Sequence, residues 1–298
     1  MESKKNTFVL IIDGTRAAEL RDALEEKGFT ITTPPYTFFA AKKPSLHCTF
    51  YTSGKLCIQG KEAKEFIEFY LEPEFLQTFP ITLENLKPHL GSDEAGKGDF
   101  FGPLCVAGLY ADTKGIEALK ALGVGDSKTL KDSLVITLCR KLKQTFPHAI
   151  IRLYPWKYND LYARFGNLNR MLAWAHASIL EKLSKETGCV DALVDQFAKK
   201  ELLESFVNIP KLKQNLVQKT KGESDLVVAA ASILARGAFL EGLEKLEKEY
   251  TFKLPKGASK KVIDAGTDFI QTHGQEALKF VGKLHFKTLD AILKKIQK

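Results

Sequence analysis

The stretch GSDEAGKGDFFGP, residues 91–103, decides how the rest of the chain is interpreted. Gly91 to Lys97 fill the first seven positions of a phosphate-binding P-loop, whose pattern is G-x-x-x-x-G-K-[ST]. The same residues can instead form a strand that ends in the acidic pair Asp93 and Glu94, followed by a glycine-rich turn. The two interpretations require opposite electrostatics, because a P-loop offers backbone amides to phosphate and an acidic pair repels it.

The P-loop interpretation fails at two positions. Gly98 follows Lys97, so the hydroxyl that would hold magnesium is missing. Asp93 and Glu94 would also lie inside the phosphate cradle, where their negative charges repel the ligand. The sequence therefore favours a carboxylate site over a nucleotide triphosphatase.

Asp93 and Glu94 supply half of a site for divalent cations. Neighbouring side chains on a regular strand point to opposite faces, so we expect the strand to end here and residues 95–98 to turn. Magnesium takes oxygen ligands and typically binds one or two carboxylates together with substrate phosphate. Two such ions can stabilise the attacking and the leaving oxygen of a phosphodiester displacement. More carboxylates are therefore expected elsewhere in the chain.

The segment CVDALVDQF, residues 189–197, offers a third carboxylate. Its apolar residues predict a buried strand, and Asp195 falls at the C-terminal end of that strand. Open α/β sheets place their sites at such ends. An aspartate at the end of a strand is also a common turn former, so both roles are open for Asp195.

The segment KGESDLVVAAASILAR, residues 221–236, offers a fourth. Glu223 and Asp225 flank Ser224 just before a helix rich in alanine. We expect Ser224 to be the N-cap and one of the two acids to interact with the positive end of the helix. The other acid is then available for the site.

The chain is long enough for two domains, with 298 residues and 44% hydrophobic residues. Its net charge of +8 suggests an anionic partner. Residues 1–88 hold 11 Lys and Arg against 12 Asp and Glu, so the excess positive charge lies entirely in residues 89–298. A polyanion should therefore bind mainly to this second part.

Two secondary-structure patterns divide the chain. Residues 1–80 predict a small α+β domain with a strand at 6–13 and a helix at 15–28. Short β-type runs follow at 29–33, 37–43, 45–52 and 55–60, and a second helix starts at residue 61 and ends near Pro73. Residues 81–88, with Pro88 at the end, read as a linker. From residue 89 strands alternate with helices, which predicts an α/β domain with a central mixed sheet over residues 89–298 and a basic C-terminal helix.

These motifs resemble the type 2 ribonuclease H superfamily. The resemblance is carried by DEAGKGDFFGP, GDSK at 125–128, VDQF at 194–197 and KGES…AAASILAR at 221–236. Within the superfamily the chain is more similar to ribonuclease HIII than to ribonuclease HII. It has GKG where ribonuclease HII typically has GRG. Ribonuclease HII also uses a C-terminal tyrosine to sense an RNA–DNA junction, whereas in this chain no tyrosine follows Tyr250. Its first 80 residues also resemble the N-terminal domain of ribonuclease HIII, which is similar to half of the TATA-box-binding protein. The resemblance implies that residues 1–80 form a substrate-binding domain.

The resemblance implies an endonuclease that cleaves the RNA strand of RNA–DNA hybrids and leaves 3′-hydroxyl and 5′-phosphate ends. It implies two divalent ions, Mg²⁺ or Mn²⁺, held by Asp93, Glu94, Asp195 and Glu223, with Asp225 as the alternative fourth ligand. A ribonuclease HII-like enzyme that also incises at single ribonucleotides in DNA is the alternative function. A catalytically silent nucleic-acid-binding protein is a third hypothesis.

The substrate-binding residues follow from the same resemblance. Gly96, Lys97 and Gly98 form the turn whose backbone can approach the RNA minor groove and contact 2′-hydroxyls, which distinguish RNA from DNA. Lys97 and Lys128 are candidate phosphate partners, and Ser127 can donate to the nucleic-acid backbone or cap a helix. His176, on an apolar helix, is expected to be a packed and hydrogen-bonded core residue.

The remaining composition predicts the setting of the enzyme. Five cysteines without C-x-x-C spacing argue for a reducing compartment and against structural zinc. We expect no apolar run to reach membrane-spanning length, and the N-terminus does not resemble a secretory signal. We therefore expect a cytoplasmic monomer without an obligate protein partner, whose partner is a nucleic acid.

Overall fold

The structure is a computed structural model that describes residues 7–12, 14–67, 71, 87–124, 130–220 and 222–297. Of residues 11, 64, 65 and 223 only the backbone is described. The chain divides into two compact units, the N-terminal unit (residues 1–83) and the C-terminal unit (residues 84–298). Most of the predicted linker at 81–88 and the end of the helix predicted to start at residue 61 lie outside the described residues. The predicted domain boundaries stay predictions.

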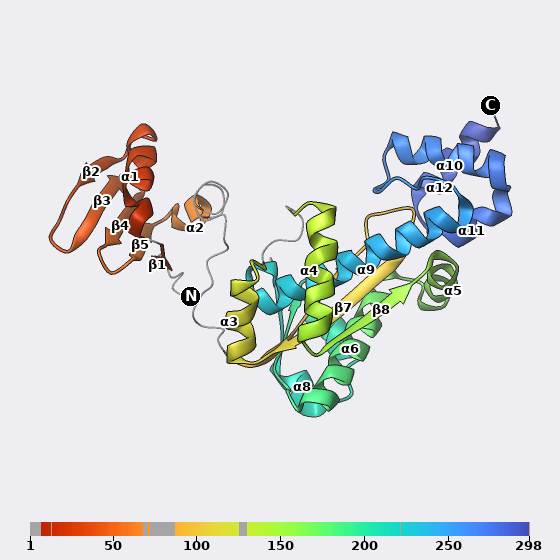
Figure 1. The fold of residues 1–298 in the computed structure, drawn as a ribbon, viewed down its shortest axis with the longest axis horizontal. Helices are drawn as coiled ribbons and strands as arrows, with labels where there is room; N and C mark the ends of the chain where they lie inside the picture. Colours follow the sequence, from red (N-terminus) through yellow and green to blue (C-terminus); the bar gives the residue numbers. More distant parts are fainter. Residues whose placement is uncertain are drawn as a thin grey trace. The chain divides into compact units, whose positions relative to one another are not determined.

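The N-terminal unit contains an antiparallel five-stranded sheet in the order β1-β5-β4-β3-β2, with α1 against one face (Figure 1). All five strands and α1 lie where the sequence predicts them. The elements are β1 (Thr7–Ile11), η1 (Gly14–Arg16), α1 (Ala17–Glu26), β2 (Thr30–Thr32), β3 (Thr37–Lys43), β4 (Leu46–Tyr51), β5 (Lys55–Gly60) and α2 (Ala63–Phe66).

Alternation along the strands builds the core of this unit. In β4 the side chains of Leu46, Cys48 and Phe50 are buried, whereas the side chains between them are more exposed. This period of two is expected for a strand with one face on the core. Phe39 and Phe50 pack edge to face with ring centroids 5.8 Å apart. Phe39 and Phe50 therefore belong to the core of this unit.

The C-terminal unit is built on a mixed five-stranded sheet in the order β10-β9-β6-β7-β8. Strand β6 pairs antiparallel with β7 and parallel with β9, and β10 pairs parallel with β9. The predicted mixed sheet and α/β class are confirmed. The strands are β6 (His89–Ala95), β7 (Leu104–Ala111), β8 (His148–Leu153), β9 (Ala192–Asp195) and β10 (Leu216–Lys219).

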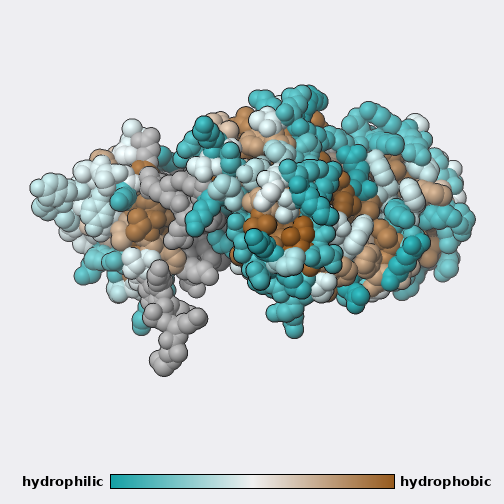
Figure 2. Space-filling model, turned by 90° about the horizontal axis from the view of Figure 1, so that it is seen from below, coloured by the Kyte–Doolittle hydropathy of each residue, from teal (hydrophilic) through white to brown (hydrophobic). Residues whose placement is uncertain are grey.

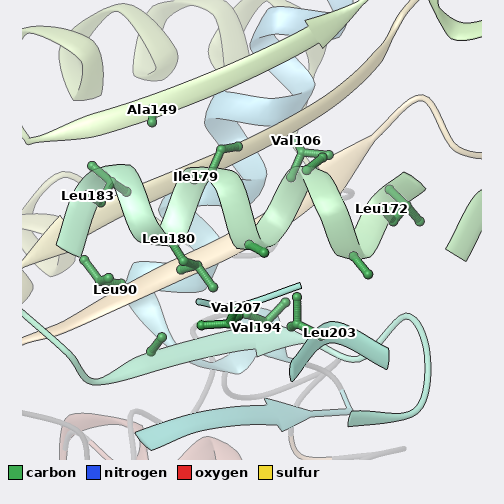
Figure 3. Packing of buried hydrophobic residues seen from close by; sticks show 14 of the residues in the cluster. Leu90, Val106, Ala149, Leu172, Ile179, Leu180, Leu183, Val194, Leu203 and Val207 are labelled. Carbon is green, nitrogen blue, oxygen red and sulfur yellow. The ribbon is translucent and has the colours of Figure 1, made fainter. Parts of the chain in front are cut away.

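Helices cover both faces of this sheet (Figure 1). The helices are α3 (Thr113–Ala121), α4 (Asp132–Thr145), α5 (Pro155–Phe165), α6 (Leu168–Thr187), α7 (Lys200–Glu204), α8 (Pro210–Asn215), η4 (Gly222–Ser224), α9 (Leu226–Tyr250), α10 (Lys260–His273), η5 (Gln275–Ala277), α11 (Leu278–Val281) and α12 (Lys287–Ile296). Leu172, Ile179 and Leu183 of α6 belong to a buried apolar cluster. The same cluster includes Val106 of β7 and Val194 of β9 (Figure 3).

Helix α9 packs closely against β6 and β7 because small residues meet there. A Cβ atom added to Gly91 would lie 2.5 Å from the main-chain carbon of Val227, so only glycine allows this approach. The alanine-rich start of α9 is buried, because its small side chains let the helix lie close to the sheet. This contact fixes the start of α9 beside the strand that carries the acidic pair.

The expectation that no apolar run reaches membrane-spanning length is wrong for α9. Its 25 residues are long and apolar enough to cross a membrane, with a mean hydropathy of 1.7 over an 18-residue window. In the described structure 83% of that window is buried inside the protein, as in the core helix of a soluble protein. Hydrophilic side chains surround the apolar ones on the face shown in Figure 2.

Several elements of the C-terminal unit do not follow from the sequence pattern. The apolar run at 148–156 predicts a strand that includes Pro155, but Pro155 stands in the first turn of α5, a position that suits its fixed φ angle. Helix α10 carries Gly266 in its middle, where Ile292 of α12 packs so closely that a Cβ atom would lie 2.3 Å from it. Strand β10 has only four residues. Glycine used for packing and short edge strands both weaken the sequence signal.

Candidate active site

Two neighbouring parallel strands bring Asp93 and Asp195 to the same edge of the sheet. Ser92 on β6 pairs in register with Val194 on β9, so the next residue on each strand is an aspartate. The C-terminal ends of parallel strands meet at one edge, where α/β sheets hold their sites. The predicted convergence of Asp93 and Asp195 is thus built into the strand register.

Strand β6 does not end at Asp93 as expected but continues to Ala95. Both acidic residues therefore lie on a regular strand, and they have partners on opposite faces of the sheet. The Asp93 carboxylate accepts a hydrogen bond from Ser232 of α9, and the Glu94 carboxylate one from His176 of α6. The expected turn begins only at Gly96.

Asp93 is 7% exposed, and its surroundings disfavour the charged form of its carboxyl group. Burial, then the negative charges of Glu94 and Asp195, raise the pKa of Asp93 to about 7. Hydrogen bonds from Ser232 and from the Glu94 amide oppose this shift only in part. Mutual repulsion of converging carboxylates is what a bound cation would relieve.

Glu94 lies between two basic partners. Burial alone would raise its pKa, but the His176 hydrogen bond and the positive charge of Lys97 outweigh burial and lower the pKa of Glu94. His176 Nε2 lies 3.2 Å from Oε2, and Lys97 Nζ lies 3.3 Å from Oε1. The carboxylate is thus held ionised and oriented from both sides.

His176 connects the acidic pair to the interior of the fold. Its ring is fully buried, stacks on Phe197 at a centroid distance of 4.8 Å and places Nδ1 2.7 Å from Ser92 Oγ. The Ser92 hydroxyl donates to the carbonyl oxygen of Ala107 on β7. The predicted packed and hydrogen-bonded histidine is confirmed. Its contact with Glu94 could not be found from the sequence, because 82 residues separate the two.

Asp195 contacts the start of the segment at 221–236, which offers the fourth carboxylate. Its Oδ1 accepts a hydrogen bond of 2.7 Å from the Gly222 amide, and a Cβ atom on Gly222 would lie 2.8 Å from the Asp195 Cα. Only glycine therefore fits beside the end of β9. This contact brings the backbone of Glu223, the next residue, beside the same sheet edge. The Glu223 side chain lies outside the described part, so its role as a ligand stays a prediction.

Asp225 is the N-cap of α9, which corrects the expectation for Ser224. Its Oδ1 accepts from the amides of Val227 at 2.9 Å and Val228 at 3.1 Å, and lies 3.0 Å from His89 Nε2. Burial would raise the pKa of Asp225, but the His89 contact and the two amides lower it. An aspartate suits a cap because its charge also favours the positive helix end.

The two glycines of the GKG turn have different surroundings. Gly96 has φ +86°, and a Cβ atom there would lie 2.3 Å from the Pro103 carbonyl oxygen and 2.9 Å from Phe239. At Gly98 an added Cβ atom would meet no atom within 4 Å. The fold itself therefore requires glycine at 96, whereas the space above residue 98 is open to a ligand. The predicted residues Ser127 and Lys128 lie outside the described residues.

The residues present fit a divalent cation by their chemistry. Asp93, Glu94 and Asp195 supply carboxylate oxygens, the ligands that Mg²⁺ and Mn²⁺ prefer. Burial and then the negative charges of Glu94 and Asp195 raise the pKa of Asp93, and a bound cation would offset both effects. Among the side chains that the structure describes, which omit Glu223, no three His, Cys, Asp or Glu residues are arranged so that they could hold a metal ion.

Comparison with known proteins identifies the family. A family model described as "Ribonuclease HII" matches residues 90–289, and one described as a domain of unknown function matches residues 7–79. Ribonuclease HIII of Protochlamydia amoebophila (strain UWE25) is 49% identical over 295 residues, which cover 98% of each protein. The chain belongs to the ribonuclease HIII family.

Other members of the ribonuclease HIII family agree. Ribonuclease HIII of Chlamydia felis (strain Fe/C-56) is 47% identical over 96% of this chain and 97% of its own. The crystal structure of Bst-RNase HIII in complex with Mn²⁺ matches with a TM-score of 0.71 and 31% identity, covering 98% of this chain and 99% of that one. Aquifex aeolicus RNase H3 matches with a TM-score of 0.57 and 28% identity, covering 93% and 99%. The predicted family, fold and enzyme class, a ribonuclease, are confirmed.

Proposed function

We propose that this chain cleaves the RNA strand of RNA–DNA hybrids and leaves 3′-hydroxyl and 5′-phosphate ends. The observation that carries the proposal is that β6 and β9 bring Asp93, Glu94 and Asp195 to one sheet edge, where burial and then the charges of the other two carboxylates raise the pKa of Asp93. Membership of the ribonuclease HIII family supports the substrate class.

Two divalent ions, Mg²⁺ or Mn²⁺, would be held by Asp93, Glu94, Asp195 and Glu223. When bound, such ions activate water and stabilise the charge that develops on the phosphate. A relative, Bst-RNase HIII, was solved in complex with Mn²⁺. Glu223 is favoured over Asp225 as the fourth ligand, because Asp225 already caps α9 and contacts His89.

The chain's own residues then position the reacting groups. His176 fixes the direction of Glu94, and its ring is held in turn by Ser92 and Phe197. Such partners behind metal ligands set the orientation and basicity of the ligands. Lys97, with 41% of its side chain exposed, contacts Glu94 and can turn toward a phosphate.

The RNA strand would be recognised at the GKG turn. Open space above Gly98 lets the main chain approach a sugar closely, and a 2′-hydroxyl there distinguishes RNA from DNA. Gly96 provides the sharp bend that leads to this point. Ser127 and Lys128 are proposed as further contacts with the nucleic-acid backbone.

The proposal extends to the setting of the enzyme. We expect a cytoplasmic monomer whose partner is an RNA–DNA hybrid, with no obligate protein partner. All five cysteines are free, in keeping with a reducing compartment. The positive charge of residues 89–298 suits a polyanion, so binding should weaken steeply as salt rises.

A cleavage assay tests the function directly. The protein is incubated with a hybrid, double-stranded RNA, double-stranded DNA and a DNA duplex containing one ribonucleotide, each with Mg²⁺, with Mn²⁺ and with chelator. We expect cleavage of the hybrid only, dependent on metal. Incision at the single ribonucleotide would favour the ribonuclease HII-like alternative, and hybrid binding without cleavage would favour a silent binding protein.

A further inference from the structure

The loop that follows the GKG turn is held by distant parts of the chain. Phe100 donates its amide to the Gly257 carbonyl at 2.9 Å, and Gly102 donates to the Val281 carbonyl at 3.0 Å. The Gly257 amide in turn donates to Asp99 Oδ1 at 2.6 Å. Residues 99–102 are therefore fixed by segments that lie after α9, in the region of α10 to α12 (Figure 1).

Lys283 is the centre of this attachment. Its Nζ donates to the main-chain carbonyl oxygens of Asp99 at 2.7 Å and Gly102 at 2.7 Å, and lies 3.4 Å from that of Phe101. Its own amide donates to the Phe100 carbonyl at 2.9 Å. Four consecutive carbonyls of the loop thus face the backbone and the side chain of one residue.

Burying this lysine is costly, which argues against a role in stability alone. Lys283 has no exposed surface, and no carboxylate of the described residues lies within ion-pair distance of its Nζ. A buried ammonium without an ion pair carries a large desolvation cost. An apolar side chain of similar length would fill the space without that cost. The carbonyl oxygens of the loop, by contrast, need a donor in this dry environment.

We propose that Lys283 is a positioning residue for hybrid recognition, whose side chain holds residues 99–102 so that Gly98 is presented to the RNA strand. The inference rests on the proposed function, because it assigns the support of the turn that would contact the substrate. Asp99 directly follows Gly98, and its amide donates to the Gly96 carbonyl at 3.3 Å. A shift of the Asp99 carbonyl would therefore move the whole GKG turn.

The surroundings of the ammonium group agree with this role. Burial lowers the pKa of Lys283 to about 7, and attraction to Asp99 and Cys105 opposes the shift in part. The Tyr158 ring centroid lies 5.7 Å from Nζ. Burial and the positive charge of Lys283 lower the pKa of His285. The group thus sits among weak partners, and the loop carbonyls are its main contacts.

The test compares Lys283→Met with Lys295→Met in the full chain. Methionine has a similar length but no donor, and Lys295 is a half-exposed lysine of α12 paired with Asp264. Steady-state cleavage of a hybrid gives kcat and KM, fluorescence anisotropy without divalent metal gives hybrid affinity, and calorimetry gives Mn²⁺ affinity. For Lys283→Met we expect KM and the hybrid Kd to rise about tenfold, with kcat and Mn²⁺ affinity within about threefold of wild type. Lys295→Met should match wild type.

Lys283→Gln serves as the conservative variant, because the glutamine amide keeps two N–H donors. Its KM should lie between the KM of Lys283→Met and that of wild type. An unchanged KM in folded Lys283→Met, or an equal fall of kcat and Mn²⁺ affinity with KM constant, would overturn the inference. Loss of the folded C-terminal unit in both variants would assign Lys283 to stability and overturn it too. Wild-type protein that leaves the hybrid intact in the same assay would instead contradict the proposed function.

Discussion

The two sheets of this protein differ in what they bury. Among the described residues of the N-terminal unit, Thr37 is the single buried polar side chain, and the core is filled by Phe39, Phe50 and aliphatic residues. The C-terminal unit buries polar and ionisable groups around β6 and the loop behind it. These include His89, Ser92, Asp93, His176, Asp225, Ser232 and Lys283.

This difference shows where the chemistry of the molecule lies. A buried polar group is costly unless it is hydrogen-bonded, so a core without function avoids such groups. Each of the buried groups around β6 has partners on another strand or helix, as Ser92 has in Ala107 and His176. We infer that the core of the first sheet serves stability, whereas the core of the second accepts a cost in stability for catalysis.

The largest effect is expected from Asp93→Asn. This change keeps the shape and the Ser232 contact but removes the charge that would hold cations. A metal site supplies several kcal/mol of transition-state stabilisation, so kcat should fall about 10³-fold or more, measured by single-turnover cleavage of a hybrid. Hybrid affinity without metal should stay close to wild type. Asp268→Asn, at an exposed position of α10, is the matched control, and full activity in Asp93→Asn would contradict the site.

His176→Ala should have the next largest effect. Without the imidazole, Glu94 loses the hydrogen bond that orients it, while Asp93 and Asp195 keep theirs. Loss of a partner behind a metal ligand costs about 10–100-fold in metal affinity or activity. Calorimetric titration with Mn²⁺ would report this directly. His176→Gln keeps a donor and should recover part of the loss, whereas equal loss in both variants would show that packing on Phe197 is what matters.

The GKG turn offers a pair of substitutions with opposite expectations. Gly98→Ala meets open space, so the melting temperature should stay the same while the hybrid Kd rises about tenfold, since a methyl group would obstruct the approach of the RNA strand. Gly96→Ala should instead lower the melting temperature, because φ +86° and the Pro103 carbonyl both oppose a side chain. Thermal melts and anisotropy separate the two. Normal hybrid binding by Gly98→Ala would remove this turn from the substrate contacts.

The raised pKa of Asp93 makes the stability of the metal-free protein depend on pH. Burial and the charges of Glu94 and Asp195 raise this pKa from 3.8 to about 7, so between these values the folded state holds a proton that the unfolded state has released. The free energy of unfolding therefore falls as pH rises through this window. Each unit of pKa difference corresponds to about 1.4 kcal/mol.

Thermal melts of the protein with chelator at about pH 5.5 and about pH 7.5 measure this pH dependence, and we expect a lower melting temperature at the higher pH. The change seen in Asp93→Asn is subtracted, so that the contribution of Asp93 remains. Added Mn²⁺ should raise the melting temperature more at the higher pH, where the carboxylate is free of its proton. An identical pH response in wild type and Asp93→Asn would show that Asp93 titrates normally.

The sequence predicted the parts of the site that are local and missed those that depend on distant contacts. The mixed α/β sheet followed from strands that alternate with helices, and the convergence of Asp93 with Asp195 followed from apolar runs that end in acidic residues. The continuation of β6 to Ala95 did not, because Ala95 gives no signal against a turn. The contacts of His176 with Glu94 and of Lys283 with the Asp99 carbonyl join segments 82 and 184 residues apart. No local pattern encodes such pairs.

The same limit explains Asp225. A helix start with Ser224 and Asp225 side by side has two possible N-caps, and local preference does not choose between them. His89 decides it, since its ring contacts Asp225 from the start of β6 and favours the charged carboxylate there. The assignment of Glu223 to the metals is thus an inference by exclusion, which a Glu223→Gln variant would test by Mn²⁺ titration.

The smallest effect on catalysis is expected in the N-terminal unit, where Phe50→Ala sharpens the contrast between the two sheets. Phe50 has no exposed surface and packs against Phe38 and Phe39. Truncation of a buried phenylalanine costs about 3–5 kcal/mol, so this unit should melt at a lower temperature. Because its core holds no group of the site, kcat on a hybrid should stay within about twofold of wild type at temperatures where the unit is folded. A large fall in kcat under those conditions would mean that the first sheet contributes to the chemical step, and the contrast between a stabilising and a catalytic sheet would not hold.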